Sequence, residues 1–204
     1  MRVAIVGNGN VGSALGSNIA EAGHEVVYGV RGPKIGTESG GGIPLRSVAE
    51  AAAHADVIIL AVHWPAVDDA LKACGNIDGR ILVDCTNPYD FQNALAALVP
   101  ADQSAASLIA EKTTAKVVKA FNQVGAAVMA DARTRQVRPL QFVASDHDDA
   151  RALVLQLARD IGFDARDGGG IEYARELEGM ARLWIAQAFA HGMEPTTAWA
   201  FSAG

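Results

Sequence analysis

The sequence predicts an α/β fold, a doubly wound and mostly parallel sheet with a short helical extension at the C-terminus. Three observations support this prediction. An apolar segment near the N-terminus runs into a glycine-rich turn, later apolar runs alternate with helical patterns, and one long helical pattern follows the last run. We expect residues 1–204 to form a single dinucleotide-binding domain, with the C-terminal helix and tail at about residues 171–204.

The glycine-rich turn carries the strongest functional signal. A short apolar run leads into Gly-x-Gly-x-x-Gly at residues 7–12, and the helical stretch that follows closes at Gly23. In a dinucleotide site, Gly7 makes the tight turn, Gly9 lets the phosphates approach, and Gly12 lets helix and strand pack closely. The helix N-terminus attracts the pyrophosphate. An ordinary glycine-rich turn is the alternative, but the strand and helix in this order favour a Rossmann-type nucleotide site.

Apolar runs predict the remaining strands. Residues 56–62 read Asp-Val-Ile-Ile-Leu-Ala-Val, a nearly continuous apolar run that is typical of a strand buried on both faces. The other predicted strands lie at residues 25–30, 80–84, 116–121, 140–144 and 163–166. Because helical segments separate most of these strands, we expect parallel pairing and right-handed crossovers.

Capping residues mark several predicted helices. Ser47 and Glu50 form a capping-box pattern before a short alanine-rich helix, and Pro65 suits the first turn of another helix. The predicted helices lie at residues 47–54, 64–73, 104–112, 124–132, 148–161 and 171–190. Residues 88–104 form a compact segment with little room for an elaborate loop.

The C-terminal segment is expected to contact a second copy of the chain. The long helix carries an apolar stripe made of Leu177, Met180, Ala181, Trp184, Ile185, Ala188 and Phe189. The tail beyond it carries Trp199 and Phe201. These two side chains either pack against another subunit or fold back onto their own sheet, and both alternatives stay open. We expect a homodimer formed through the C-terminal helix.

Composition disfavours several classes of protein. The chain of 204 residues is 50% hydrophobic and 20% charged, which is ordinary for a globular protein. A net charge of −6 without a basic stripe argues against nucleic acid as a partner. No apolar run is long enough for a membrane span, and a strand that starts at residue 2 leaves no room for a signal peptide. Cys74 and Cys85 lack metal-ligand spacing, so we expect no metal site and reduced thiols in a cytoplasmic protein.

The end of the second predicted strand indicates the nicotinamide cofactor. NAD sites usually place Asp or Glu there, where the carboxylate accepts a hydrogen bond from the ribose 2′-hydroxyl. Residues 28–34 read Tyr-Gly-Val-Arg-Gly-Pro-Lys and contain no acid. Arg31 is placed to bind the 2′-phosphate of NADP through charge-assisted hydrogen bonds, and Lys34 adds a second cation. A solvated loop arginine is the alternative, which the missing acid disfavours.

Several segments, taken in order, resemble one family. They are residues 7–12, 23–31, 61–65, 84–88, 104–106, 116–122, 175–178 and 192–193. Together they resemble the coenzyme F420-dependent NADP oxidoreductases, and the same domain recurs in the cytosolic reductase portion of certain membrane ferric reductases. The resemblance extends from residue 1 to about residue 193. It implies direct hydride transfer between NADP(H) and a deazaflavin, with both rings stacked at the carboxyl ends of the strands.

The resemblance also implies roles for individual residues. The pyrophosphate would be held by Asn8, Gly9, Asn10 and Val11, and the 2′-phosphate by Arg31 and Lys34. The nicotinamide end would be lined by Val62, His63, Asn87, Pro88, Phe121 and Asn122. Hydride transfer between two rings needs no side-chain acid or base, so no catalytic residue is assigned. His63 either hydrogen-bonds or protonates the acceptor, or merely packs beside the ribose.

The second substrate stays open in the sequence. The resemblance implies coenzyme F420, while a flavin, a quinone or another small acceptor suits the same NADPH-dependent chemistry. A non-catalytic NADP-binding regulator is a further alternative, because a nucleotide site alone does not require turnover.

Replacement of Arg31 tests the cofactor prediction. We expect Arg31→Ala to weaken NADPH binding about tenfold or more, because a charge-assisted pair with the 2′-phosphate is lost, and to leave NADH binding nearly unchanged. Titration of both nucleotides by nicotinamide fluorescence measures the two affinities. Equal affinity of the wild type for NADPH and NADH, or an unchanged NADPH affinity in the variant, would contradict the prediction.

Overall fold

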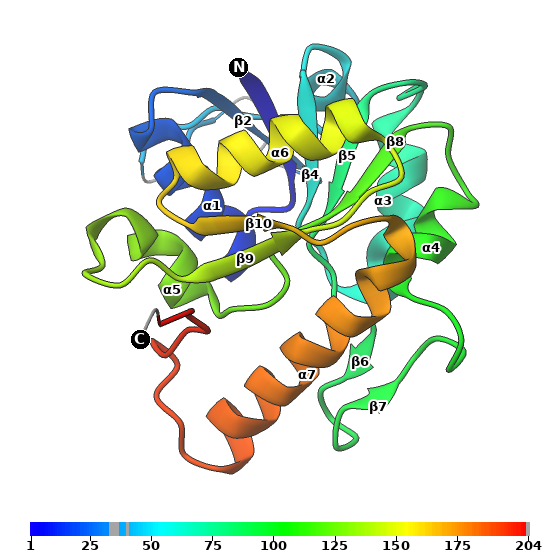
Figure 1. The fold of residues 1–204 in the computed structure, drawn as a ribbon. Helices are drawn as coiled ribbons and strands as arrows, with labels where there is room; N and C mark the ends of the chain where they lie inside the picture. The colour runs from blue at the N-terminus through cyan, green and yellow to red at the C-terminus, as the bar shows by residue number, and fades with distance from the viewer. Residues whose placement is uncertain (33–36, 40, 203–204) are drawn as a thin grey trace.

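A parallel sheet forms the centre of the molecule (Figure 1). The computed structural model describes residues 1–32, 37–39 and 41–202. Within them lies a 6-stranded sheet of order β3-β2-β1-β4-β5-β8, whose pairings are all parallel. Its strands are β1 (Arg2–Val6), β2 (Glu25–Val30), β3 (Leu45–Ser47), β4 (Val57–Leu60), β5 (Ile81–Asp84) and β8 (Lys116–Lys119). The strand order reverses between β1 and β4, which is where doubly wound sheets bind ligands.

Helices cover both faces of this sheet (Figure 1). They are α1 (Asn10–Glu21), α2 (Val48–Ala53), α3 (Val67–Cys74), α4 (Ala105–Ala110), α5 (Ala126–Asp131), α6 (Asp148–Asp160) and α7 (Ala174–Ala190). Val57 and Ile59 of β4 belong to the core shared with α1, α5 and α6. Ile58 and Leu60 belong to the core shared with α2, α3 and α4. Because alternate residues enter opposite cores, the strand is apolar throughout, as the sequence predicts.

The last two strands form a pair of their own. They are β9 (Leu140–Val143) and β10 (Asp164–Asp167), which pair in parallel and are connected by α6. An antiparallel bridge between Lys119 and Ala144 joins this pair to β8, with backbone N–O distances of 2.8 and 3.1 Å. The fold is therefore the predicted Rossmann-type, mostly parallel sheet with a C-terminal helix. The β9–β10 pair is joined to it in the antiparallel direction.

Several predicted helices are shorter than expected and are flanked by 3₁₀ turns. The turn η1 (Trp64–Ala66) precedes α3, η2 (Ala132–Thr134) follows α5, and η3 (Ile171–Tyr173) precedes α7. Pro65 lies in the first of these turns and has no N–H to donate. At the third turn, the first N–H group is that of Ile171, and it donates to an Asp146 carboxylate oxygen at 2.8 Å. The predicted capping box at Ser47 and Glu50 is present.

A β-hairpin occupies part of the segment that we expected to be compact and plain. Its strands β6 (Tyr89–Asp90) and β7 (Ala96–Ala97) pair antiparallel. Two-residue strands are too short to show an alternating pattern. The residues with positive φ at its tip are Ala94 and Leu95 rather than glycine or asparagine, so the usual turn signal is missing. The short edge strand β3 was missed for a similar reason, since it has only three residues.

The C-terminal tail folds back along β9. The Leu140 N–H donates to the Trp199 carbonyl oxygen at 2.8 Å, and the Trp184 indole N–H donates to the Thr197 carbonyl oxygen at 2.8 Å. Trp199 packs partly buried against the chain's own core. Phe201 stays 61% exposed and contacts Phe142 edge to face. Of the two alternatives for the tail, folding back is therefore the one that Trp199 adopts.

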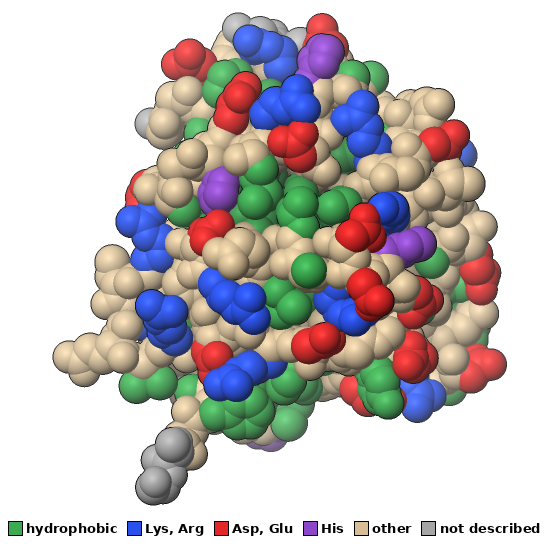
Figure 2. All heavy atoms as spheres, turned by 45° about the horizontal axis from the view of Figure 1, so that its top comes forward, with side chains coloured by type: hydrophobic (Ala, Val, Ile, Leu, Met, Phe, Trp, Pro, Cys, Tyr) green, Lys and Arg blue, Asp and Glu red, His purple; other side chains and the backbone are tan. Residues whose placement is uncertain are grey.

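Charged side chains of both signs share the surface. On the face drawn in Figure 2, Lys and Arg side chains are interspersed with Asp and Glu and do not gather into a stripe. None of the helices described in residues 1–32, 37–39 and 41–202 combines the length and apolar character that a membrane crossing requires. Cys74 and Cys85 are buried free thiols. Burial raises the pKa of Cys74 to about 11 and that of Cys85 further, so both thiols are poorly reactive.

Candidate functional site

The turn after β1 fits tightly between its neighbours. Gly7 has a φ of +101°, and its N–H donates to the Gly29 carbonyl oxygen on β2 at 3.0 Å. A Cβ atom at Gly7 would lie 2.5 Å from the Ala61 carbonyl oxygen, just beyond β4. Only glycine suits this position, because both the backbone conformation and the space exclude a side chain. The turn therefore lies directly at the switch point.

The other two glycines of the turn have opposite surroundings. A Cβ atom at Gly12 would lie 2.0 Å from the Gly7 carbonyl oxygen, so Gly12 lets α1 pack on the turn. A Cβ atom at Gly9 would meet no atom of the described residues within 4 Å. Gly9 also has an extended backbone, with φ −72° and ψ −166°, that any residue adopts. The chain itself thus gives no reason for glycine at Gly9, whereas an approaching phosphate does.

The N-terminus of α1 is open to an anion. The helix begins at Asn10, has no side-chain cap and carries no acidic residue in its first turn. The Ser13 hydroxyl donates to the Asn8 carbonyl oxygen at 2.9 Å, which fixes the turn without occupying the helix N–H groups. Asn10 is exposed, and Asn8 and Val11 are half-buried. The first N–H groups of a helix lack partners within the helix, so this end suits a pyrophosphate.

The end of β2 offers an unpaired cation at the same edge. Arg31 follows β2 directly and is exposed. Within the described ranges 1–32, 37–39 and 41–202, it forms no hydrogen bond or ion pair with a side chain or carbonyl group. β2 pairs with β1, so Arg31 and the glycine turn leave neighbouring strands at their carboxyl ends. Lys34, the second expected phosphate ligand, lies outside the described residues.

Residues after β4 line the other side of the switch point. The Val62 side chain lies 3.2 Å from the position that a Gly7 Cβ would take, so Val62 borders the turn. His63 is exposed, and its ring meets the ring of Phe91 edge to face, with centroids 6.4 Å apart. The sequence singles out Val62 and His63, and the structure places Val62 next to the glycine turn and His63 against Phe91.

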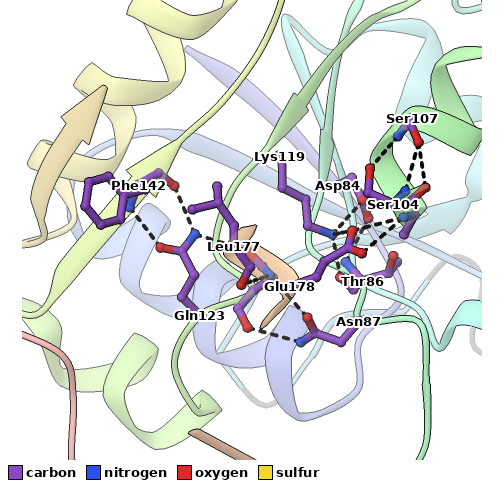
Figure 3. A network of polar contacts seen from close by, with 12 residues as sticks. Asp84, Thr86, Asn87, Ser104, Ser107, Lys119, Gln123, Phe142, Leu177 and Glu178 are labelled. Carbon is purple, nitrogen blue, oxygen red and sulfur yellow. Dashed lines mark hydrogen bonds and ion pairs between the residues drawn. The ribbon is translucent and has the colours of Figure 1, made fainter. Parts of the chain in front are cut away.

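Two asparagines lock the loops after β5 and β8 together. The Asn87 amide donates to the Asn122 carbonyl oxygen at 3.0 Å, and the Asn122 amide donates to the Asn87 side-chain oxygen at 3.2 Å. Asn122 also donates to the Leu177 carbonyl oxygen of α7 at 3.1 Å. Pro88 directly follows Asn87 in the chain and is buried. These amides fix the two loops to each other and to α7 (Figure 3).

Phe121 has a different position from the one expected. Its backbone has a φ of 60°, its side chain is fully buried, and its ring packs against Phe163 with centroids 5.9 Å apart. The positive φ turns the side chain into the core shared with α6. A role for Phe121 at the nicotinamide end therefore concerns its backbone, because its ring is buried in the core.

A buried ion cluster lies beneath these loops (Figure 3). The Lys119 ammonium, at the end of β8, lies 2.9 Å from an Asp84 oxygen and 2.9 Å from a Glu178 oxygen. It also donates to the Thr86 carbonyl oxygen at 2.6 Å. Glu178, on α7, accepts the Ala105 N–H at the start of α4 at 3.0 Å. The three charged side chains are buried, so each depends on these partners.

Burial and pairing act in opposite directions on this cluster. Burial raises the pKa of Glu178, and the neighbouring Lys119 only partly offsets this effect. Burial alone would lower the pKa of Lys119, but Asp84 and Glu178 outweigh it and raise the pKa above its ordinary value. Lys119 therefore stays charged, and its positive charge makes two buried carboxyl groups tolerable.

Sequence reasoning missed this cluster although a signal was present. Lys119 stands inside an apolar strand pattern, and Glu178 adjoins the buried stripe of the last helix beside Leu177. A charged residue at a core position indicates a buried partner, but the sequence does not say which residue that partner is.

Comparisons with known proteins agree with this geometry. Residues 2–88 match the family model described as NADP oxidoreductase coenzyme F420-dependent. The structure of a candidate F420-dependent NADP reductase from Arthrobacter sp. FB24 aligns over 100% of both chains, with a TM-score of 0.86 and 29% identity. A hypothetical protein from Sinorhizobium meliloti is 30% identical, with a TM-score of 0.74 over 84% of this chain and 86% of that one. The chain belongs to the coenzyme F420-dependent NADP oxidoreductase family.

Two metalloreductases are also similar to this F420-dependent NADP oxidoreductase family member. STEAP3 of Rattus norvegicus is 32% identical over 185 residues, which are 87% of this chain and 36% of the relative. STEAP2 of Homo sapiens is 28% identical over 195 residues and is covered to 35%. The chain thus spans about a third of the length of these curated relatives. The glycine turn and Arg31 are the parts of the chain that suit NADP(H).

A separate hollow lies at the opposite edge of the sheet. It has a volume of about 650 Å³ and is lined by residues such as Lys72, Asp78 and Thr114. Its lining includes residues that precede β5 and β8, whereas doubly wound sheets bind nucleotides where the strands end. The Lys112–Asp68 ion pair, at 2.6 Å, also borders this hollow. The carboxyl edge therefore stays the expected nucleotide site.

Replacement of Lys119 tests the role of the buried cluster. Lys119→Met leaves two buried carboxyl groups without a counter-charge, so we expect the free energy of unfolding at pH 7 to fall by about 3–5 kcal/mol. Urea unfolding followed by circular dichroism measures it. A variant as stable as the wild type would contradict the importance of the ammonium.

Glu178→Gln is the matched control. It keeps the acceptor for Ala105 and leaves a neutral Lys119–Asp84 pair, so its stability loss should be smaller than that of Lys119→Met. The folded pKa of Glu178 lies above its ordinary value of 4.5, so the folded chain takes up this proton first as the pH falls. The resulting stabilisation is complete below the unfolded pKa and is lost as the pH rises through the folded pKa. Relative to the variant, the wild type should therefore gain stability on acidification.

Proposed function

We propose that this chain transfers a hydride directly from NADPH to a deazaflavin of the F420 type. The observation that carries the proposal is the open glycine turn with the exposed Arg31 at the same edge of the sheet, where Arg31 has no ion-pair partner among the described residues. The matching family model is described as coenzyme F420-dependent, and the Arthrobacter structure carries a similar description. Both point to a deazaflavin as the partner of NADP.

The residues at the carboxyl edge fit NADPH. The turn at residues 7–12 would hold the pyrophosphate through backbone N–H groups, since Gly9 leaves the approach free of side chains. Arg31 would bind the 2′-phosphate, for which its planar fork is suited. Val62 and the interlocked Asn87 and Asn122 would border the nicotinamide. The phosphate end of the proposed site thus attracts negative charge, and hydrogen-bonded amides make the nicotinamide end rigid.

The chemistry needs little from the protein beyond orientation. When bound, NADPH supplies a hydride from its nicotinamide ring, and the acceptor takes up this hydride and one proton. His63 is the exposed titratable side chain after β4 and borders the same edge. It would donate a hydrogen bond or the proton to the acceptor, or contact the ribose.

A second candidate is an NADPH-dependent reductase of a different acceptor, such as a flavin. The similarity to two metalloreductases favours it, because their names specify neither a deazaflavin nor F420. The NADPH site is the same in both candidates, so the acceptor alone distinguishes them.

Isotope transfer tests the first candidate. The enzyme is mixed anaerobically with coenzyme F420 and NADPH that carries deuterium at the transferred position of the nicotinamide C4. We expect loss of the visible absorbance of the deazaflavin and deuterium on the carbon that receives the hydride, because the transfer is direct. Deuterium released to water would contradict direct transfer, and NADPH oxidation by FMN but not by F420 would favour the second candidate.

Gly9→Ala links this activity to the glycine turn. The backbone of Gly9 suits any residue and an added Cβ meets no atom, so the free energy of unfolding should change little. NADPH affinity should nevertheless fall about tenfold, because the methyl group occupies the phosphate approach. Gly179→Ala, also without a neighbour within 4 Å, is the control and should retain wild-type affinity.

Association of two copies through α7 stays a prediction. Leu183 and Phe189 on this helix are 52% and 77% exposed. We expect a dimer in light scattering at micromolar concentration and a shift toward monomer in Phe189→Glu, because a buried charge opposes association. A monomeric mass for the wild type would contradict this prediction.

A further inference from the structure

The β6–β7 hairpin stands directly beside the proposed site. It begins after Pro88, which follows the interlocked Asn87, and the Leu98 N–H returns to the Pro88 carbonyl oxygen at 2.8 Å. Tyr89, at its base, is held under the guanidinium of Arg182 on α7, 5.7 Å from the ring centroid. In Figure 1 the hairpin lies beside α7, below the main sheet. The base of the hairpin is therefore held from two sides, by α7 and by the loop that follows β5.

The tip of the hairpin is held in a costly conformation. Ala94 and Leu95 have φ values of 47° and 57°, which side-chain-bearing residues rarely adopt. Asp90 holds the turn, because its carbonyl oxygen accepts the N–H of Leu95 at 3.0 Å and its carboxylate accepts the N–H of Gln92 at 2.9 Å. Backbone strain of this kind concentrates at binding and active sites.

The hairpin presents an exposed aromatic ring, that of Phe91, next to the loop after β4. Phe91 follows β6 and is 54% exposed, although a phenyl ring gains by burial. Its single ring contact among the described residues is the edge-to-face contact with His63, at an interplanar angle of 77°. His63 directly follows Val62, which borders the glycine turn. Phe91 is thus an apolar wall next to the expected nicotinamide end, with much of its surface open.

We propose that Phe91 forms one wall of the acceptor subsite and packs against a planar tricyclic heteroaromatic ring, that of a flavin or a deazaflavin. This inference rests on the proposed function and adds the residue that selects the ring. The ring of His63 is nearly perpendicular to that of Phe91, and 54% of Phe91 stays exposed, which leaves surface for a stacked partner. A planar acceptor placed there would lie between the hairpin and the carboxyl ends of β4 and β5, where a nicotinamide would meet it.

Ring binding is measured with riboflavin and 5-deazariboflavin, which lack an anionic tail and so report on the ring alone. Quenching of their fluorescence is titrated with the full chain, with and without saturating NADP⁺. We expect Phe91→Ala to weaken binding of the preferred ring about fivefold or more and Phe91→Trp to stay within about twofold of wild type. Leu98→Ala, which removes another exposed apolar side chain of the same segment, is the control and should bind as wild type does.

The outcomes separate this inference from the proposed function. Equal ring affinity of the wild type and Phe91→Ala, or binding of neither ring by the wild type, would overturn the role of Phe91. Failure to bind NADP⁺ would overturn the proposed function, while the titrations without NADP⁺ still decide the inference. The affinity of Phe91→Ala for NADP⁺ should equal that of the wild type, because the phosphate contacts are elsewhere. The preference between the two rings identifies the acceptor class.

Discussion

The ammonium of Lys119 holds together the segments on which the proposed site depends. Carboxylates from β5 and α7 surround it, together with a carbonyl group from the loop after β5. A buried charge is tolerated because every partner is supplied by the fold. Asn87 and Asn122 lie three residues beyond Asp84 and Lys119 in their respective loops, and they are interlocked there. Their placement at the carboxyl edge therefore depends on the charge balance beneath them.

The two ends of the proposed NADPH site are built in opposite ways. The phosphate end consists of open backbone and an exposed arginine, so long-range attraction and flexible adjustment can operate there. The opposite end consists of mutually hydrogen-bonded amides fastened to α7. Hydride transfer is sensitive to small changes in distance, whereas phosphate binding is not, and the rigid part lies where distance matters.

Sequence predicts those features of this fold that have local causes. The glycine turn and the Ser47 capping box each depend on a few neighbouring residues, and both are found where the sequence places them. The partners of Lys119 are not predictable in this way, because they are distant in sequence. Asp84 lies 35 residues away, and Glu178 lies still farther along the chain. Phe121 stays a prediction for the nicotinamide end, and the packing of its ring on Phe163 was not predictable because the two residues are distant in sequence. The hairpin that carries Phe91 was not predictable, because neither glycine nor asparagine occupies the positive-φ positions of its turn.

The C-terminal tail covers part of an edge of β9 that could otherwise pair with another chain. β9 pairs with β10 on one side, and the Leu140 N–H on its other side is taken by the carbonyl group of Trp199. The Phe201 ring lies against Phe142 and under the guanidinium of Arg166, which are neighbours across the β9–β10 pair. Uncovered strand edges act as templates for pairing with other chains. The segment at Trp199 thus covers the Leu140 part of this strand edge, where the strand of another chain could otherwise pair.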